Sequence, residues 1–379
     1  MRISYFLPGW GHTGGSMVLY NFMDKLCERG HNVHAITPQG RVRWQAGFSA
    51  RAATQLAQPR GFLGLGKSLA KRYLPVERLQ GQFPTAALLR LSRLSQALIR
   101  NWKCSDVTIA TMCWTAYANF VLSEKTVPLY HMQHWEEVFF ADEVRRQMAC
   151  LTYRLPLVLM ANCSWLKETV RQRVGRDSWL LLPGVDTQIF HPRTGLQSKF
   201  ANPHKVRVVT YYSPIPFKGW QDAVEAMKRV FSTVGKDRVE WLVYGGQPLG
   251  NIDVPATFVG RLFGEGLGEL YSSAHIVFMP SWHESFPLPP IEAMASGAAA
   301  VVTGTGTEDY AFDGRNALVR PAKDPEQLAN AILELVGNLS KARDLAEEGM
   351  RTASTLTWNA ATDRLEAILE EAVGSRSAR

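Results

Sequence analysis

The chain has 379 residues, of which 46 % are hydrophobic and 20 % are charged. This is the composition of an ordinary globular protein, and the length exceeds one comfortable core, so we expect two domains. No apolar run approaches the roughly 20 residues that span a bilayer, and the first residues form a strand pattern too short for a signal peptide. Five cysteines without a C-x-x-C pair favour a reducing cytoplasm and argue against a structural zinc site.

The net charge of +8 is concentrated in one segment. Residues 41–103, called here the basic segment, hold twelve Lys and Arg against the single acid Glu77, or +11, which leaves −3 for the rest. A helix is expected over 86–100, with leucines on one side and arginines among its polar positions. The arginines are either solvated, on a helix that packs against a sheet, or they form a surface for an anionic membrane or acceptor. The segment lacks the interleaved aromatic residues of nucleic-acid-binding proteins, so nucleic acid is not expected.

In the first half of the chain, short apolar strand patterns alternate with helix patterns, which predicts a parallel sheet. The strands are expected at 3–8, 31–37, 106–111, 127–135 and 157–165, with helices after the first, third and fifth, the last capped by Ser164. Gly9, Gly11 and Gly14 also form G-x-G-x-x-G, a signature of NAD-binding proteins. That interpretation needs an acid at the end of the second strand, and residues 35–40 contain none. The alternative is that Gly14 and Gly15 let the backbone approach a phosphate or an acceptor.

Polar residues gather where the strand at 127–135 ends, namely His131, Gln133, His134, Glu136 and Glu137. Open α/β sheets bind their ligands at the carboxyl ends of strands. A functional role for His134 and a purely structural one are therefore both open.

The second half begins after residues 193–204, which are polar and irregular and suit an interdomain linker. Strands are expected at 205–213, 239–246, 257–262, 275–281 and 298–304, and helices at 221–230, 325–337, 340–350 and 359–373.

The most informative stretch is Glu284 to Gly297, between two of these strands. Pro289 and Pro290 indicate a helix start and Gly297 a helix end, which places Glu292 in the first helical turn. A helix N-terminus attracts anions, and the N–H groups available there are those of Ser285, Phe286, Leu288 and Ile291, since Pro287 has none. Two carboxylates beside an anion site suit a nucleoside diphosphate-sugar, because a carboxylate can accept both hydrogens of a diol. In the simpler interpretation, Glu292 complements the helix dipole and Glu284 is a loop acid.

Glu284, seven intervening residues and Glu292, followed by Ala-Met-Ala and Gly297, resemble the paired-glutamate signature of retaining glycosyltransferases with two Rossmann domains (GT-B), family 4 in particular. The resemblance implies that Glu284 lies at the donor sugar and Glu292 holds the donor ribose. It also implies that the amides between them face the sugar and phosphate, although Pro287 stands where glycine is common.

Further matches to that family follow along the chain. Lys218-Gly219 resembles its K-G motif, whose lysine meets the donor diphosphate, while Ser213 stands where relatives often have an arginine. Gly260 and Arg261 are the expected base contacts, and Arg261 is a candidate for the missing cation. Residues 304–321 resemble a loosened family segment with Glu308 at its acid, and His134 matches a residue that faces the reacting sugar.

The resemblance therefore implies an α/β fold of two Rossmann-like domains facing a central cleft, in GT-B architecture. The expected acceptor-side domain is 1–190, with a C-terminal helix at about 358–379 packing back on it, and the donor domain is 191–357. The implied catalytic residues are His134, Glu284 and Lys218, and the implied donor-binding residues are Gly14, Gly15, Gly219, Gly260, Arg261, Ser285, Phe286, Pro287, Leu288 and Glu292.

The implied reaction moves a sugar from a nucleoside diphosphate-sugar to a hydroxyl of a glycan, glycolipid or small molecule with retention of configuration. No D-x-D pair occurs, so no metal and no cofactor are expected. We expect the protein in the cytoplasm, with the basic segment as a candidate contact for the inner face of the membrane. The alternatives are a GT-B nucleotide-sugar epimerase and a non-catalytic protein that binds nucleotide-sugars or anionic glycans.

Overall fold

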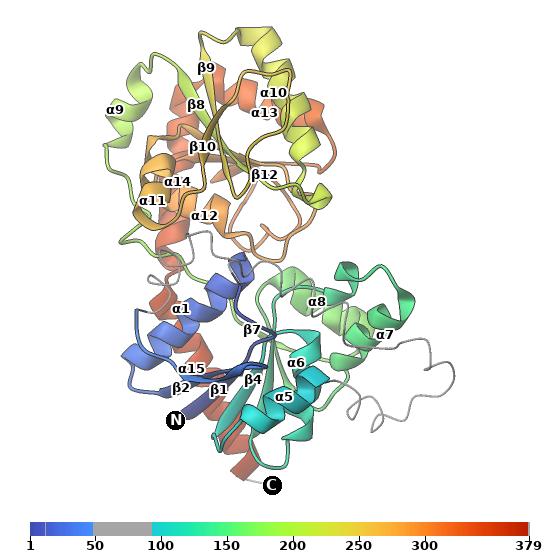
Figure 1. Ribbon diagram of the computed structural model, residues 1–379. Helices are drawn as coiled ribbons and strands as arrows, with labels where there is room; N and C mark the ends of the chain where they lie inside the picture. Colours follow the sequence, from blue (N-terminus) through green and yellow to red (C-terminus); the bar gives the residue numbers. More distant parts are fainter. Residues whose placement is uncertain (12, 48–92, 378–379) are drawn as a thin grey trace. The chain divides into compact units, whose positions relative to one another are not determined.

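The computed structural model describes residues 1–11, 13–47 and 93–377 (Figure 1). The contacts within the chain define two compact units. Unit 1 consists of Met1–Leu182 and Ala361–Arg379, and unit 2 of Pro183–Ala360. Residues 183–190, which were expected in the first domain, belong to unit 2 in this division.

Unit 1 is built on a seven-stranded sheet in the order β3-β2-β1-β4-β5-β6-β7, and β3 is its one antiparallel strand. The strands are β1 (Arg2–Phe6), β2 (Asn32–Thr37), β3 (Gly40–Arg43), β4 (Val107–Ala110), β5 (Val127–Met132), β6 (Val158–Ala161) and β7 (Trp179–Leu180). The helices are α1 (Gly14–Glu28), α5 (Arg93–Asn101), α6 (Cys113–Val121), the 3₁₀ turn η2 (Glu136–Phe139), α7 (Glu143–Thr152), α8 (Ser164–Val174) and α15 (Trp358–Ser377). The N-cap of α8 is Cys163, whose Sγ accepts from the Leu166 N–H at 3.3 Å, so the prediction of Ser164 as the cap was wrong.

Helix α5 is the described part of the helix expected over 86–100, and residues 86–92 lie outside the described residues. Its Leu98 is buried against Phe6, Ile36 and residues of α6, with Leu94 packed beside them. The leucine face of this helix is therefore part of the core of unit 1.

Helix α15 packs on unit 1 through its apolar and charged residues together. Leu365, Ile368 and Leu369 are buried. Arg29 reaches two carboxylates of α15, with an N–O distance of 2.5 Å to Glu366. These contacts join the C-terminal end of the chain to the first strands and helix of the unit.

Unit 2 is built on six parallel strands in the order β10-β9-β8-β11-β12-β13. They are β8 (Val206–Tyr212), β9 (Val239–Gly245), β10 (Thr257–Gly260), β11 (Ile276–Met279), β12 (Ala299–Thr303) and β13 (Ala317–Arg320). The helices are α9 (Leu196–Ala201), η3 (Pro216–Lys218), α10 (Trp220–Val234), α11 (Gly264–Ser273), α12 (Leu288–Ala295), α13 (Pro325–Gly337) and α14 (Leu339–Thr355).

The prediction of an irregular linker over residues 193–204 was wrong, because helix α9 lies in the middle of this range and packs on α14. Lys199 of α9 donates to the carbonyl oxygens of Ser272 and Gly297, at 3.0 and 2.6 Å, and burial lowers its pKa to about 7. This short helix is thus held by the ends of two other helices.

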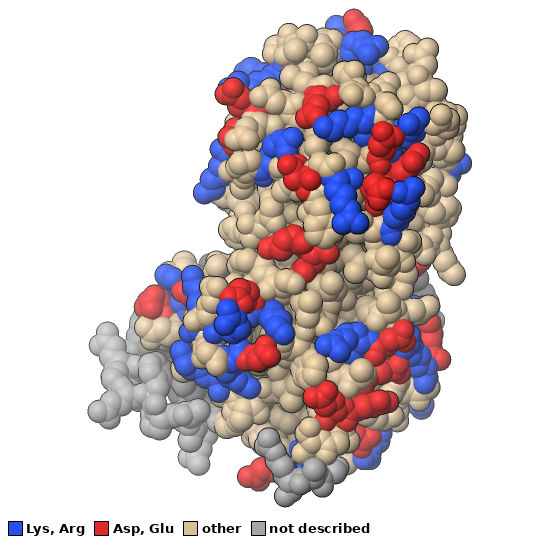
Figure 2. Space-filling view, turned by 180° about the vertical axis from the view of Figure 1, so that it is seen from behind, with Lys and Arg blue, Asp and Glu red and all other residues tan. Residues whose placement is uncertain are grey.

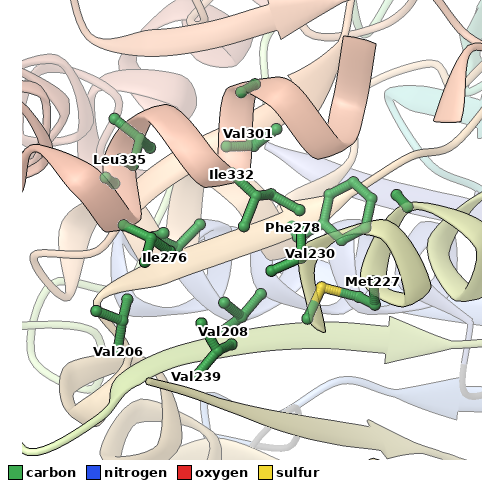
Figure 3. Packing of buried hydrophobic residues seen from close by; sticks show 14 of the residues in the cluster. Val206, Val208, Met227, Val230, Val239, Ile276, Phe278, Val301, Ile332 and Leu335 are labelled. Carbon is green, nitrogen blue, oxygen red and sulfur yellow. The ribbon is translucent and has the colours of Figure 1, made fainter. Parts of the chain in front are cut away.

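The core of unit 2 lies between the sheet and helices α10 and α13 (Figure 3). Val208, Ile276 and Val301 come from three neighbouring strands, and Met227 and Ile332 come from the two helices. Strands buried in this way read as continuous apolar runs, which is why their positions were visible in the sequence. Since all six strands are parallel, their carboxyl ends share one edge of the sheet, and the candidate site is built there.

Among the described helices, none is both long and apolar enough to cross a bilayer.

Candidate functional site

The segment between β11 and β12 forms the strand-turn-helix unit expected from the sequence. Helix α12 starts at Leu288 with Pro287 as its N-cap and ends before Gly297, whose φ of +79° is the left-handed conformation that glycine adopts easily. Glu292 lies in the second turn rather than the first, so that detail of the prediction was wrong. The helical register also directs the Ile291 N–H to the Pro287 carbonyl, which leaves Leu288 as the donor of the first turn, since Pro289 and Pro290 lack an N–H.

Glu284 and Lys218, which are 66 residues apart, meet at the carboxyl edge of the sheet. The Lys218 Nζ lies 2.6 Å from the Glu284 Oε1, and the two side chains are 25 % and 13 % exposed. Gly219 makes this meeting sterically allowed. It has a φ of +70°, and a Cβ there would lie 2.0 Å from the Pro280 carbonyl oxygen at the end of β11. A side chain at Gly219 would push η3, and with it Lys218, away from Glu284.

The backbone of Glu284 is fixed from the other side by the loop after β12. Its N–H donates to the Thr305 carbonyl oxygen at 3.2 Å. Gly306 has a φ of +92°, and a Cβ there would lie 2.5 Å from the Glu284 carbonyl oxygen. The backbone of Glu284 is therefore in close contact with residues 305–306, while its side chain pairs with Lys218.

Glu292 is enclosed among acidic and aromatic side chains. Burial, and second the charge of Asp186, raise its pKa to about 8. Burial raises the pKa of the Tyr244 and Tyr271 hydroxyls most, and the charge of Glu292 raises both further; the two hydroxyls hydrogen-bond to each other. Asp186, in the turn after β7, accepts from the Gln188 N–H at 3.0 Å. A carboxyl with such a pKa carries a proton over much of the neutral range and can both donate and accept.

Tyr310 is the residue around which three predicted acids gather. Burial raises its pKa most, followed by the charges of Glu284, Glu308 and Glu292. Its hydroxyl donates to the Pro287 carbonyl oxygen at 2.8 Å, and its ring packs edge-on against Phe286, 5.1 Å between centroids. We had not singled out Tyr310, and the available signal was its position two residues after Glu308. It links the residues before α12 to the segment 304–321.

Arg261 and Gly260 lie at the same sheet edge, after β10. Gly260 has a φ of +85° at an irregularity in strand pairing, and the Arg261 guanidinium lies over the Phe263 ring at 4.7 Å. The charges of both Arg261 and Glu284 affect Tyr211, which lies at the end of β8. Burial raises its pKa most, Arg261 lowers it, and Glu284 raises it. Ser213 is buried and accepts from the Ile215 N–H at 3.4 Å, so it carries no charge into the site.

In unit 1, the glycine loop before α1 is held by its own contacts. Thr13 caps the helix by accepting from the Ser16 N–H at 3.2 Å, and the Tyr20 hydroxyl bonds to both the N–H and the carbonyl of Gly11. Gly14 faces open space, whereas a Cβ at Gly15 would lie 2.9 Å from the Gln133 Oε1. Gly15 therefore lets the end of β5 approach the start of α1.

The polar cluster after β5 divides into different roles. His134 is buried, with its Nδ1 3.2 Å from the Trp135 carbonyl oxygen and its ring beside Phe139 and Trp165. Glu136 is also buried, and it accepts from the Cys113 N–H and the Tyr130 hydroxyl, both at 2.7 Å. Of the other members, burial lowers the pKa of His131 to about 4, and Glu137 pairs with Arg146 and Arg173.

No group of three or more His, Cys, Asp or Glu residues able to hold a metal ion occurs within residues 1–11, 13–47 and 93–377.

Comparison with solved structures defines the class of fold. Sucrose-phosphate synthase from Thermosynechococcus elongatus aligns over 99 % of both chains with a TM-score of 0.70 and 16 % identity. HepE from Anabaena, solved in complex with UDP-glucose, aligns over 98 % of this chain and 100 % of its own, with a TM-score of 0.71 and 16 % identity. The chain thus has the α/β fold of GT-B glycosyltransferases, with two Rossmann-like domains, as expected.

Sequence comparison identifies the domain that carries the site. Residues 206–338 match the family described as glycosyl transferases group 1, so unit 2 holds a domain of that family. The MMP alpha-(1->4)-mannosyltransferase of Mycolicibacterium hassiacum is 32 % identical over 205 residues, which are 50 % of this chain and 47 % of that protein. The D-inositol 3-phosphate glycosyltransferase of Corynebacterium glutamicum is 25 % identical over 219 residues, 52 % of each chain. The chain spans about half the length of the curated relatives it matches.

Proposed function

We propose that this protein is a retaining, metal-independent glycosyltransferase of family 4. It transfers a sugar from a nucleoside diphosphate-sugar to a hydroxyl of a glycan, glycolipid or small molecule. The observation that carries the proposal is the Lys218–Glu284 ion pair. Glu284 lies just before the N-terminus of α12, the helix that contains Glu292. The group 1 domain over 206–338 and the transferases among its relatives support it.

In this proposal, the donor lies along the carboxyl edge of the sheet of unit 2. Glu292 holds the ribose, and its raised pKa lets it act as donor and acceptor to neighbouring hydroxyls. Gly260 and Arg261 contact the base, and Gly219 admits the phosphates beside Lys218. Since a UDP-glucose complex exists for HepE, uridine nucleotides are the first donors to test.

The chemical step breaks the bond between the anomeric carbon and the diphosphate. Lys218 and the amides of Phe286 and Leu288 stabilise the negative charge of the leaving group, as preorganised donors do in other enzymes. When the Lys218–Glu284 ion pair breaks, Lys218 moves with the departing phosphate and Glu284 turns to the donor sugar. The acceptor hydroxyl attacks the face that the diphosphate leaves, through an oxocarbenium-like transition state, and passes its proton to an oxygen of the departing diphosphate. His134 of unit 1 is the proposed catalytic residue that faces the reacting sugar, and Gly14 and Gly15 at the start of α1 are proposed to let the backbone approach a phosphate or the acceptor.

The test is a panel of nucleotide-sugars screened for thermal stabilisation, followed by the best donor with candidate acceptors. We expect one donor to raise the melting temperature and its sugar to appear on an acceptor in the donor's anomeric configuration, measured by proton NMR. An inverted product contradicts retention. Epimerised donor without any acceptor favours the epimerase alternative, and binding without turnover favours the non-catalytic one.

A further inference from the structure

The described ends of the basic segment lie on one face of unit 1. Arg41 and Arg43 of β3 pair with Ile36 and His34 of β2, so their side chains share the side of the sheet on which Ile36 packs against α5. The end of α5 is joined to the β2–β3 turn, because the Asn101 Nδ2 donates to the Thr37 carbonyl oxygen at 2.9 Å. Arg100, in the last turn of α5, and Lys103, two residues after it, are exposed. We call Arg41, Arg43, Arg100 and Lys103 the cationic face.

The cationic face carries no compensating acid within the described parts of the chain. None of its four side chains lies within 4.0 Å of a carboxylate there. Arg41 instead bonds to the His34 Nε2 at 2.8 Å. Burial lowers the pKa of that imidazole, as do Arg41 and Arg43, so it accepts as a neutral ring.

The acids that flank the basic segment in sequence are paired elsewhere. Glu28 pairs with Lys25 at 2.7 Å, and Asp106 pairs with Arg2 at 2.6 Å. By contrast, the view in Figure 2 shows Lys and Arg side chains alternating with Asp and Glu. A face of one sign is therefore a local feature and not a consequence of the net charge alone.

Protection of an edge strand explains only part of this face. Charged residues on an edge strand such as β3 prevent it from pairing with another chain, which is a sufficient reason for Arg41 and Arg43. It gives no reason for Arg100 and Lys103, which lie on a helix end, nor for the lack of acids around all four.

We propose that the cationic face binds the surface of an anionic lipid bilayer. A bilayer surface requires only positive charge spread over an accessible face. A sugar chain also requires acceptors for its hydroxyl hydrogens, and the cationic face contains no carboxylate to provide them. The attraction is mainly electrostatic, so the binding is reversible and weakened by salt. It goes beyond the proposed transfer reaction, because it concerns where the protein works.

The test measures sedimentation of the full chain with vesicles of phosphatidylcholine, with and without about one third phosphatidylglycerol. We expect binding to the anionic vesicles only, and loss of it at 0.5 M salt. Each neutralised cation should weaken binding about fivefold, the equivalent of about 1 kcal/mol per charge. Arg100→Gln with Lys103→Gln, and separately Arg41→Gln with Arg43→Gln, should therefore each weaken it about 25-fold. The first pair is fully on the surface, which keeps the test valid if the half-buried Arg41 affects folding.

The matched control removes the same charge from unit 2. Lys228 and Arg229 are exposed and lie near the carboxylates of Asp253 and Glu225, and their double Gln variant should bind vesicles like the wild type. Equal loss in this control, or wild-type binding by both test pairs, overturns the proposal. So does loss of heparin binding with unchanged vesicle binding, which would assign the face to an anionic glycan. Sugar transfer to a soluble acceptor should stay unchanged in the test pairs, so failure of the transfer proposal is seen separately in the wild type.

Discussion

The carboxyl edges of the two sheets use their polar residues differently. At the edge of unit 2, Lys218 and Glu284 form an ion pair, and Lys218, Glu284 and Glu292 all remain partly accessible. At the edge of unit 1, Glu136 and Glu137 are used by internal hydrogen bonds and ion pairs, and His134 is buried among aromatic rings. The carboxyl edge of unit 2 therefore presents partly accessible charged groups, whereas most polar groups at the edge of unit 1 are used in contacts within the unit.

The difference arises from backbone contacts that only glycine allows. In unit 2, Gly219 and Gly306 bring two loops against the end of β11 and against Glu284. In unit 1, Gly15 brings only a neutral amide, Gln133, to the helix start. The charged groups of unit 2 are thus held in place at the edge of the sheet, whereas the glycine contact in unit 1 involves only a neutral amide.

Lys218→Ala should have the largest effect on activity. Because Lys218 faces the leaving diphosphate in our proposal, its loss should lower the transfer rate by about 10²- to 10³-fold, as removal of one transition-state donor does elsewhere. Steady-state kinetics with the best donor provides the measurement. Lys228→Ala, an exposed lysine of the same unit, should leave the rate unchanged, and a rate loss shared by both variants would remove the special role of the Lys218–Glu284 pair.

Gly219→Ala should have the largest effect on stability. Both Gly219 and Gly175 have the left-handed conformation, with φ values of +70° and +73°, but a Cβ at Gly175 meets nothing within 4 Å. We expect Gly175→Ala to cost about 1 kcal/mol from backbone strain alone, and Gly219→Ala to cost about 3 kcal/mol because of the added collision with Pro280. Denaturant unfolding measures both, and equal costs would show that the close approach to β11 is not tight.

His134→Asn tests whether the carboxyl edge of the unit 1 sheet has a function different from that of the unit 2 sheet. If His134 serves the acceptor side, kcat should fall by roughly 10- to 100-fold through loss of positioning, while donor affinity stays unchanged, because the donor binds unit 2. His204→Asn, at an exposed position, serves as the control in the same assay. A fall in donor affinity without a change in kcat would contradict the assignment of His134.

Glu292→Gln should have the smallest effect, and it should depend on pH. The pKa of Glu292 is raised in the folded protein to about 8, so the folded state binds the proton more tightly than the unfolded state does. The contribution of Glu292 to the free energy of unfolding therefore falls as the pH rises from about 4.5 to about 8. The neutral Gln variant should match the wild type near pH 4.5 and be more stable than it near pH 8, where the wild type has lost the contribution of the raised pKa.

Thermal unfolding at the two pH values measures this difference. Glu370→Gln, at an exposed position of α15, should show no such trend. A Glu292→Gln variant that is less stable at pH 8 than at pH 4.5, relative to the wild type, would indicate an ionised and stabilising Glu292.

The elements of unit 2 were largely predictable from sequence because they depend on local patterns. Helix α13 has the predicted bounds, since Asp324 caps it by accepting from the Gln327 N–H and Pro325 suits its first turn. Strand β12 differs from its predicted range by one residue at each end. In contrast, α9 was missed because its six residues are held by α14 and by carbonyls far along the chain.

The site was predictable only as a set of residues. The resemblance placed Lys218 and Glu284 at one ligand, but their direct contact depends on Gly219 and Gly306, whose neighbours are distant in sequence. The gathering of three acids around Tyr310 depends on the fold of the loop after β12 and had no local signal beyond proximity to Glu308.

Isothermal titration calorimetry of the best nucleotide-sugar with the wild type and with Glu292→Ala tests the central claim most directly. The claim is that the edge formed by Lys218, Glu284 and Glu292 holds the donor. We predict binding by the wild type and affinity at least about tenfold lower in the variant, the loss expected when a buried acceptor of ribose hydroxyls is removed. Equal affinity of the two proteins for the donor would contradict the claim.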